Sequence, residues 1–449
     1  MYNLPVFKCD NEKINMAYRM AIGDICSNVV PYKDGMLDGE KPVMLAGAGY
    51  NTPWTRDAAI NVWNCGGILM PEVSKNTLLS VIDENNGKPR AGGQYWDAVI
   101  WVIGAWWYYV YTGDEEFYKF SITVVENTIE YFEDTEFDAE LNLFRGAACY
   151  GDGVSAYPDF YSVGESNICR FAEKKPEFCA KTGFGLPMYV LSTNCLYYEA
   201  YKIAYKMTEK AEYLEKANKM KAAINKHFWN EELGRYNYIV DNFGGSTHAE
   251  GLGHSFAILF GVADEEQIKK IIENQPISKH GIPCVYPGFE RYKDYGMARH
   301  SETVWPHIQV FWGDAVCKYD VKKFEHELMT LSENAIRDGY FSEIYHPETG
   351  ERYGGIQEFQ GKMIDEWKSE KRQMWCATGY IHMVLCNLIG LSFEKEGIHI
   401  KPMKTDLVKK IDLYGLKYRN TEINIHISGE ESKEKFVPCD AEGIVEIYL

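Results

Sequence analysis

Two carboxylate residues stand in stretches whose composition suits acid–base chemistry. Glu343 lies among apolar residues just before a turn, so burial should partly desolvate its carboxylate, as expected of an acid or a base. Asp152 stands between Gly151 and Gly153, which would let a ligand approach the backbone closely. Ordinary structural roles also fit, since Glu343 could lie on the surface beside a hairpin and Asp152 could belong to a tight turn. From the residues alone, both carboxylates are candidates for acid–base chemistry, and the structural roles remain open.

Tryptophan recurs beside polar groups where predicted apolar helices begin. These candidate binding residues are Trp54, Arg56, Asp57, Trp96, Asp97, Trp305, His307, Gln373 and Trp375. An aromatic face packs against the C–H face of a pyranose, while carboxylates and amides bind its hydroxyl groups. Arg56 and Asp57 could instead form an ion pair that caps their helix, and Asp97 could be only a helix N-cap. Because the pattern recurs at the starts of most predicted inner helices, we interpret these residues as a carbohydrate-binding set.

The composition limits the classes of partner. The 449 residues include 65 acidic and 47 basic ones, for a formal charge of −18. Such a chain repels phosphate backbones and anionic membranes, so we expect no nucleic acid partner. No apolar run approaches the ~20 residues of a membrane span, and the polar start lacks the features of a signal peptide. We expect a cytoplasmic protein with no membrane partner; the sequence does not indicate an oligomeric state.

The cysteines and loops predict no metal and no cofactor. Twelve cysteines, among them Cys65, Cys195, Cys317 and Cys386, are scattered through apolar stretches without a CxxC pair or a close His partner. This distribution is typical of reduced thiols in a core, not of a disulfide framework or a zinc site. The sequence also contains no ligand cluster or phosphate-binding loop, so we expect neither a bound metal nor an organic cofactor.

Helical periodicity predicts the elements that must position these residues. About twelve helices are expected, near residues 11–28, 57–69, 72–84, 96–112, 114–134, 186–208, 210–228, 250–262, 264–273, 302–318, 320–337 and 371–390. Many are joined by short turns in which a glycine can end one helix and an aspartate can cap the next. Residues 98–107 are apolar nearly all round, whereas 202–226 are amphipathic. We therefore predict an all-α fold, an (α/α)6 toroid of six helical hairpins, whose inner helices begin at one mouth.

Three long connections and a C-terminal segment interrupt this helical pattern. The connections span residues 137–185, 274–301 and 338–370, and long loops in compact domains are usually functional. We interpret the first as a lid that closes the mouth into a pocket and favours exo-action on a short glycoside. After residue 390 the pattern changes to the alternation of β-strands. We expect a catalytic domain over 1–390 and a small β appendage over 391–449.

The order and spacing of these motifs resemble the six-hairpin glycosidases. These include mannosylglycerate hydrolases, family 63 α-glucosidases and, more distantly, the amylo-1,6-glucosidase domain of debranching enzymes. The resemblance covers nearly all of residues 10–390. It rests on Trp54-Thr55-Arg56-Asp57, Tyr95-Trp96-Asp97 followed by Tyr111-Thr112-Gly113-Asp114, Gly151-Asp152-Gly153, Val304-Trp305-Pro306, Glu343-Ile344-Tyr345 with Pro347 and Gly350, and Gln373-Met374-Trp375.

The resemblance implies a glycoside hydrolase that inverts anomeric configuration in a single displacement. By position, Asp152 matches the general acid and Glu343 the general base. The match at Asp152 is looser, because Arg145-Gly146 stands where the family often has Trp and Ser-Gly before the acid. Asp159 is therefore a second candidate for the acid. The two carboxyl groups of an inverting enzyme stand ~6.5–9.5 Å apart, which leaves room for the attacking water.

Two other functions fit the same fold class. One is a uronide-acting lyase or unsaturated glucuronyl hydrolase, which would need a cationic lining for the substrate carboxylate. Near the proposed mouth the basic residues are chiefly Arg56 and Arg145. The other is a carbohydrate-binding relative that has lost catalysis. The product distinguishes the three: a reducing sugar, an unsaturated uronide, or none. The motifs leave the sugar, the anomer and the linkage open.

Overall fold

The computed structural model describes residues 4–93, 96–180, 184–364, 367–428 and 433–449. Helices occupy all twelve predicted stretches within these ranges. They are α1 (Glu12–Ser27), α2 (Thr55–Asn61) with η1 (Val62–Gly66) and α3 (Gly67–Leu69), α4 (Pro71–Ser80), η2 (Trp96–Ile100) with α5 (Trp101–Thr112), α6 (Glu115–Glu136), α8 (Leu191–Thr208), α9 (Ala211–Phe228), α10 (Gly251–Leu259), α11 (Glu265–Asn274), α12 (Pro306–Val316), α13 (Val321–Asp338), and α14 (Met374–His382) with η7 (Met383–Leu388). Tyr95 of the Tyr95-Trp96-Asp97 motif lies outside the described residues.

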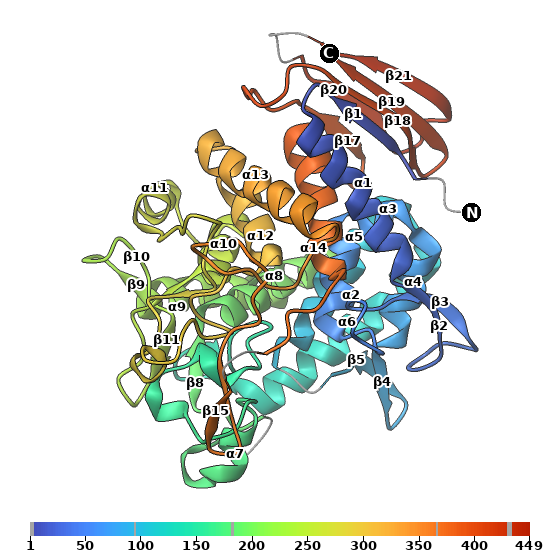
Figure 1. The fold of residues 1–449 in the computed structure, drawn as a ribbon. Helices are drawn as coiled ribbons and strands as arrows, with labels where there is room; N and C mark the ends of the chain where they lie inside the picture. The colour runs from blue at the N-terminus through green and yellow to red at the C-terminus, as the bar shows by residue number, and fades with distance from the viewer. Residues whose placement is uncertain (1–3, 94–95, 181–183, 365–366, 429–432) are drawn as a thin grey trace.

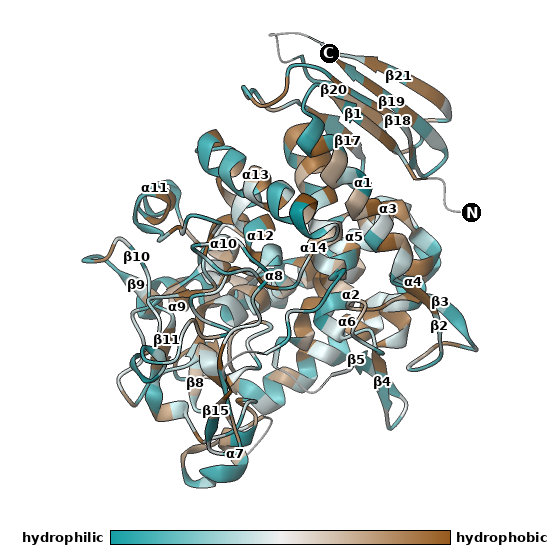
Figure 2. Ribbon diagram, viewed as in Figure 1, coloured by the Kyte–Doolittle hydropathy of each residue, from teal (hydrophilic) through white to brown (hydrophobic). Residues whose placement is uncertain are grey.

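Six of the described helices contact one another in a closed order (Figure 1). The order is α2, α5, α8, α10, α12 and α14, and α14 in turn contacts α2. Helices α1, α4, α6, α9 and α13 each pack against one or more members of this ring. The ring helices are more deeply buried than the helices that pack around them. For example, α10 in the ring buries eight of its nine residues, whereas α9 outside it buries six of 18. In Figure 2 the ribbon of α13 carries both hydrophilic and hydrophobic residues, a composition typical of a helix with one face in solvent.

The turns between paired helices contain the predicted glycine at the end of one helix and the predicted aspartate cap at the start of the next. Gly113 ends α5 in the left-handed conformation (φ 67°), and the Asp114 side chain caps α6 by accepting a hydrogen bond from the Phe117 amide. Before α11, Asp264 and Gln267 form a capping box. These local signals explain why the helix boundaries follow the sequence so closely.

The all-α prediction needs correction, because strands are interspersed among the helices. Short two-stranded ladders are β2 (Val29–Tyr32) with β3 (Lys41–Met44), β4 (Ile82–Asn85) with β5 (Lys88–Ala91), β6 (Phe137–Asp138) with β7 (Leu143–Phe144), β8 (Met188–Val190) with β11 (Ile239–Asp241), β9 (Trp229–Asn230) with β10 (Arg235–Tyr236), β12 (Ala249–Glu250) with β13 (Val285–Tyr286), and β14 (Gln357–Phe359) with β15 (Lys362–Ile364). Strands of two to four residues carry too little alternation to be recognised. Short helices also occur in the long connections: η3 (Val154–Ala156), η4 (Asp159–Tyr161), α7 (Arg170–Lys174), η5 (Pro176–Phe178) and η6 (Glu290–Tyr292).

The C-terminal residues form two sheets, and the larger one includes a strand from the start of the chain (Figure 1). Its order is β1 (Val6–Cys9), β18 (Ile411–Tyr418), β19 (Thr421–Ile427) and β21 (Gly443–Tyr448). The smaller sheet contains β16 (Leu391–Glu394), β17 (Gly397–Ile400) and β20 (Lys435–Pro438). The β appendage therefore includes residues 6–9 as well as residues beyond 390. It contacts α3, α5 and η7, at the C-terminal ends of the ring helices.

Within the described ranges, none of the helices has both the length and the apolar character needed to cross a bilayer.

Glu327 on α13 makes the stability of this packing depend on pH. Its fully buried Oε2 accepts hydrogen bonds from Gln309 Nε2 at 2.9 Å and from the Ile282 amide at 3.4 Å. Burial raises the pKa of Glu327 from 4.5 to about 8. The folded state therefore binds this proton more tightly than the unfolded state does. Its stabilising contribution is complete below the unfolded pKa and is lost as the pH rises through about 8.

We expect Glu327→Gln to flatten the pH dependence of unfolding between about pH 5 and 8. The slope of the unfolding free energy should change by about 1.4 kcal/mol per pH unit, the value for one proton. Urea denaturation at several pH values measures this slope. Glu273→Gln, an exposed change on α11, is the matched control and should leave the slope unaltered. A slope in the Glu327 variant equal to that of wild type would contradict the assignment.

Candidate active site

A cavity of about 260 Å³ lies where α2, α12 and α14 begin. Its lining is mixed, with carboxylates, guanidinium groups, amides and four tryptophans. The lining residues are Tyr50, Trp54, Arg56, Asp57, Tyr150, Asp152, Gly153, Ser166, Asn167, Arg299, His300, Trp305, Glu343, Gln357, Trp367, Gln373 and Trp375. All three long connections contribute to it. The structure thus brings Asp152 and Glu343 together, although 191 residues separate them in the sequence.

Three donors hold the carboxylate of Glu343 in one orientation. Tyr50 donates to Oε1 at 2.6 Å, while Arg299 and the Glu370 amide donate to Oε2 at 2.9 and 3.2 Å. Glu343 is 1% exposed, as its apolar neighbours in the sequence predict. Burial, followed by the negative charge of Glu343, raises the pKa of Tyr50, so this hydroxyl keeps the proton that it donates. These three donors therefore fix the direction in which the Glu343 carboxylate points.

Asp152 reaches the cavity from the first long connection. Its Oδ2 lies 3.3 Å from Nη2 of Arg56 and its Oδ1 lies 3.5 Å from Nε2 of His300. The side chain is 28% exposed, so it can meet a ligand directly. Gly153 is needed for this approach, because a Cβ there would stand 2.0 Å from Nδ1 of His300. The absence of a side chain at Gly153 thus allows His300 to pack closely beside Asp152, in addition to any role in a turn.

Several carboxyl groups lie close together in and behind the cavity wall, with only two arginines in the lining. Asp57 is fully buried, and desolvation raises its pKa to about 7, opposed by Arg56 and reinforced by Glu343, Asp152 and Asp97. A group of carboxyl groups in which one binds a proton near neutral pH is typical of acid–base sites. Burial also lowers the pKa of His300 to about 3, so its imidazole is neutral beside Asp152.

Three of the predicted binding residues lie behind the cavity wall. Trp96 is fully buried and its Nε1 donates to the Ala148 carbonyl at 2.9 Å, beneath the connection that carries Asp152. Asp97 accepts a hydrogen bond from the Tyr150 amide at 2.6 Å and lies 3.6 Å from Nη1 of Arg56. His307 is buried and stacks on Trp375, with ring centroids 4.1 Å apart. These side chains support the lining from behind, whereas Trp54, Arg56, Asp57, Trp305, Gln373 and Trp375 line the cavity as predicted.

Asp159, the second candidate for the acid, lies outside this cavity. It begins η4, its side chain is 60% exposed, and its Oδ1 accepts a hydrogen bond from Nη1 of Arg291 at 2.9 Å. The cavity lining includes Asp152 and not Asp159. The geometry therefore favours Asp152 as the partner of Glu343.

Sequence patterns missed about half of the lining. The residues not proposed from sequence are Tyr50, Tyr150, Ser166, Asn167, Arg299, His300, Gln357 and Trp367. One signal was available, because Arg299 and His300 directly precede the segment that contains Trp305. The others lie in irregular connections or beside motifs, and no periodicity indicates where such side chains point.

The comparisons with known proteins support the resemblance seen in the sequence. Residues 198–375 match the family model of the mannosylglycerate hydrolase MGH1-like glycoside hydrolase domain, a stretch that contains Glu343 but not Asp152. Among curated proteins no match was found.

Solved structures of glycosidases share the fold. A GH63 mannosylglycerate hydrolase from Thermus thermophilus, in complex with glucose, aligns with a TM-score of 0.59 at 13% identity, over 82% of this chain and 100% of that one. A GH78 family rhamnosidase of a Bacillus species gives 0.59 at 14% identity over 99% of this chain, and a sialidase gives 0.64 at 13% identity over 93%. This chain spans only 43% of the rhamnosidase and 38% of the sialidase. The resemblance to six-hairpin glycosidase-type enzymes is thereby confirmed.

Proposed function

We propose that this protein is an inverting glycoside hydrolase in which Glu343 is the general base and Asp152 the general acid. One observation carries the proposal: the two carboxyl groups line the same cavity, together with several tryptophans. We further propose that the closed order of α2, α5, α8, α10, α12 and α14 is the inner ring of an (α/α)6 toroid. Residues 1–390 other than β1 would form the catalytic domain, and residues 391–449 together with β1 the appendage.

The surroundings of the two carboxyl groups suit different roles. Glu343, held by Tyr50 and Arg299, would accept a proton from a water molecule that attacks the anomeric carbon. Asp152, more exposed and set among other carboxyl groups, would give its proton to the leaving glycosidic oxygen. One bond forms to the water oxygen as the glycosidic bond breaks, so the configuration inverts. We expect the carboxyl groups to stand ~6.5–9.5 Å apart in the sugar complex.

The cavity favours a short, neutral glycoside. At about 260 Å³ it falls near the lower end of the usual ~300–1,000 Å³ for small-molecule sites. Trp54, Trp305 and Trp375 offer aromatic faces for a pyranose ring, and Gln357 and Asn167 offer amide groups for hydroxyls. Three long connections enclose the mouth, which favours exo-action.

A uronide-acting enzyme is less well supported. The two guanidinium groups of the lining already face carboxylates: Arg56 lies 3.6 Å from Asp97, and Arg299 lies 2.9 Å from Glu343. An anionic sugar would therefore meet a lining whose positive charges are neutralised.

The configuration of the first product tests the mechanism. We expect a panel of aryl glycosides and disaccharides to include a substrate whose initial product, followed by proton NMR before mutarotation, has the anomeric configuration opposite to that of the substrate. Inversion follows because a single displacement by water exchanges the face of the anomeric carbon. Retention would contradict the single displacement, an unsaturated uronide would indicate a lyase, and absence of turnover across the panel would favour a binding protein.

A further inference from the structure

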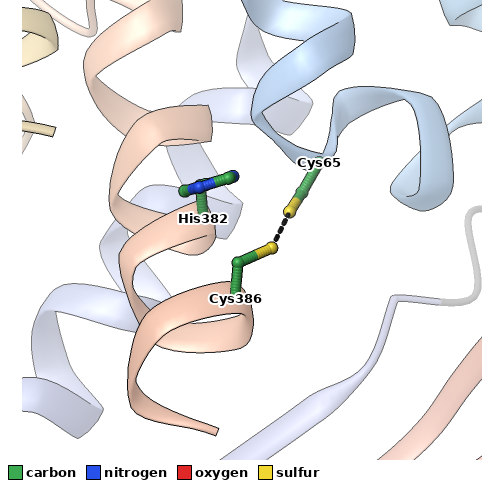
Figure 3. A group of neighbouring side chains, drawn as sticks. All are labelled: Cys65, His382 and Cys386. Carbon is green, nitrogen blue, oxygen red and sulfur yellow. Dashed lines mark hydrogen bonds between the residues drawn. The ribbon is translucent and has the colours of Figure 1, made fainter. Parts of the chain in front are cut away.

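A second cluster of reactive side chains lies at the other end of the ring helices. Cys65 in η1, His382 at the end of α14 and Cys386 in η7 each place a ligand atom within 4.8 Å of the other two (Figure 3). The two sulfur atoms are 3.6 Å apart. On α14, His382 lies seven positions after Trp375 of the cavity lining, which is about 10 Å along the helix axis. The cluster is therefore distinct from the candidate active site.

The spacing of the three groups suits a tetrahedral metal ion. With metal–sulfur bonds of ~2.3 Å, two thiolates on one tetrahedral zinc stand ~3.8 Å apart, close to the sulfur separation found here. Two Cys and one His form a ligand set that favours zinc over harder cations such as magnesium or calcium. Cys65 is fully buried, while Cys386 is only partly buried, which leaves a short route for an ion to enter.

Neighbouring polar residues also orient the His382 side chain. Nε2 of His382 lies 3.3 Å from Oδ2 of Asp314, and Asn387 holds the other carboxylate oxygen at 2.6 Å. Among the described residues, Nδ1 of the buried His382 has no hydrogen-bond partner. Metal-binding histidines are commonly oriented by a carboxylate in this way.

The backbone at the cluster is irregular on both sides. Cys65 has φ 70°, a conformation that residues with a side chain rarely adopt, and it interrupts the helix that runs from α2 to α3. Cys386 lies in the π-helical segment η7. Such interruptions are frequent at functional sites. Here they direct the two sulfur atoms toward each other.

We propose that Cys65, His382 and Cys386 form a zinc site that joins the first and last helices of the ring. The helix that contains Cys65 continues α2, and the one that contains His382 and Cys386 continues α14; α2 and α14 are in contact. A metal bound here would cross-link residues 321 positions apart at the seam where the ring closes. Any thiol still protonated would release its proton to solvent when the metal–sulfur bond forms. The ion would hold the two helices together, with a water molecule completing its tetrahedron, and the site is independent of the proposed catalytic residues.

This inference differs from the expectation of scattered core thiols. In the sequence His382 and Cys386 are four residues apart, which places them on one helix face, but their partner Cys65 lies far earlier in the chain and carries no metal-binding spacing. Only the closure of the ring brings the three together.

Metal analysis of the full-length protein tests the proposal. Protein purified without chelators and then equilibrated with ZnCl₂ should retain one zinc per chain after gel filtration, and Co²⁺ in its place should give thiolate-to-cobalt charge-transfer absorption. Removal of the metal should lower the Tm by roughly 5 °C or more. Cys65→Ala and Cys386→Ala should lose the metal and the cobalt spectrum. Cys195→Ala, at a fully buried thiol on α8, is the matched control and should keep both.

Three results would overturn the proposal. They are wild-type protein without stoichiometric metal and without the cobalt–thiolate band, metal binding that persists in both Cys variants, and a Cys65–Cys386 disulfide found by thiol counting and mass spectrometry. The metal content of the wild-type protein decides the question by itself, so the test stands even if a Cys variant fails to fold. None of these readouts depends on glycosidase activity.

Discussion

Glu343→Gln should reduce kcat at least about 1,000-fold, toward the upper part of the range for loss of a general base, while sugar affinity stays within a few-fold. The amide has nearly the shape of the carboxylate and can still accept a hydrogen bond from Tyr50, but it cannot take a proton from water. Initial rates, together with calorimetric titration of the product sugar, measure the two effects separately.

A matched change tests whether the loss is specific. Glu348→Gln alters an exposed glutamate in the same long connection and should leave kcat unchanged. Near-normal turnover in the Glu343 variant would refute the assignment of the base. A loss of sugar binding equal to the loss of rate would instead indicate a collapsed site, because the ion pair with Arg299 at 2.9 Å also depends on this carboxylate.

Asp152→Asn should produce a loss that depends on the leaving group. For an alkyl glycoside the departing oxygen needs a proton, so we expect a loss of at least about 100-fold. A dinitrophenyl leaving group departs as a stable anion, so the loss there should be less than about tenfold. The alkaline limb of the pH–rate profile should also disappear, since it reports the ionisation of the acid. Steady-state rates on the two substrates measure the contrast.

Two comparisons make this result diagnostic. Glu343→Gln should slow both substrates similarly, because water attack is required whatever the leaving group. Asp159→Asn should behave like wild type, since Asp159 is exposed and bound to Arg291 outside the cavity. If the dependence on leaving group appeared in the Asp159 variant, the acid would have to be reassigned. An equal loss on both substrates in the Asp152 variant would point to a positioning role for that residue.

The helices were predictable because their signals are local. Gly113 and Asp114 end one helix and begin the next. On α9 the apolar residues recur at helical spacing, and this spacing alone identifies a half-exposed helix. The long strands β18 and β19 were recognisable for the same reason. By contrast, β1 is only four residues long, and its partner β18 lies about 400 positions further along the chain. Nothing within Val6–Cys9 identifies that partner.

The candidate site was predictable only in part. The residues at helix starts, such as Trp54 and Trp375, were found because the helices themselves were found. Trp96 and His307 belong to the same pattern, yet they face the interior, because neighbouring positions on a helix point in different directions. Tyr50 and Arg299 were missed as ligands of Glu343, since the two donors come from separate connections.

By itself the sequence predicted the helical segments and the turns between them, and it offered two carboxyl groups as candidates for acid–base chemistry. These properties depend on the spacing of apolar residues and on glycine and aspartate at turns, which act over a few residues. The tertiary structure decided which side chains share the cavity, and it brought Cys65 to His382 and Cys386 at the opposite end of the ring. Both groupings arise only when the last inner helix packs against the first, and a contact across some 300 residues leaves no local pattern in the chain.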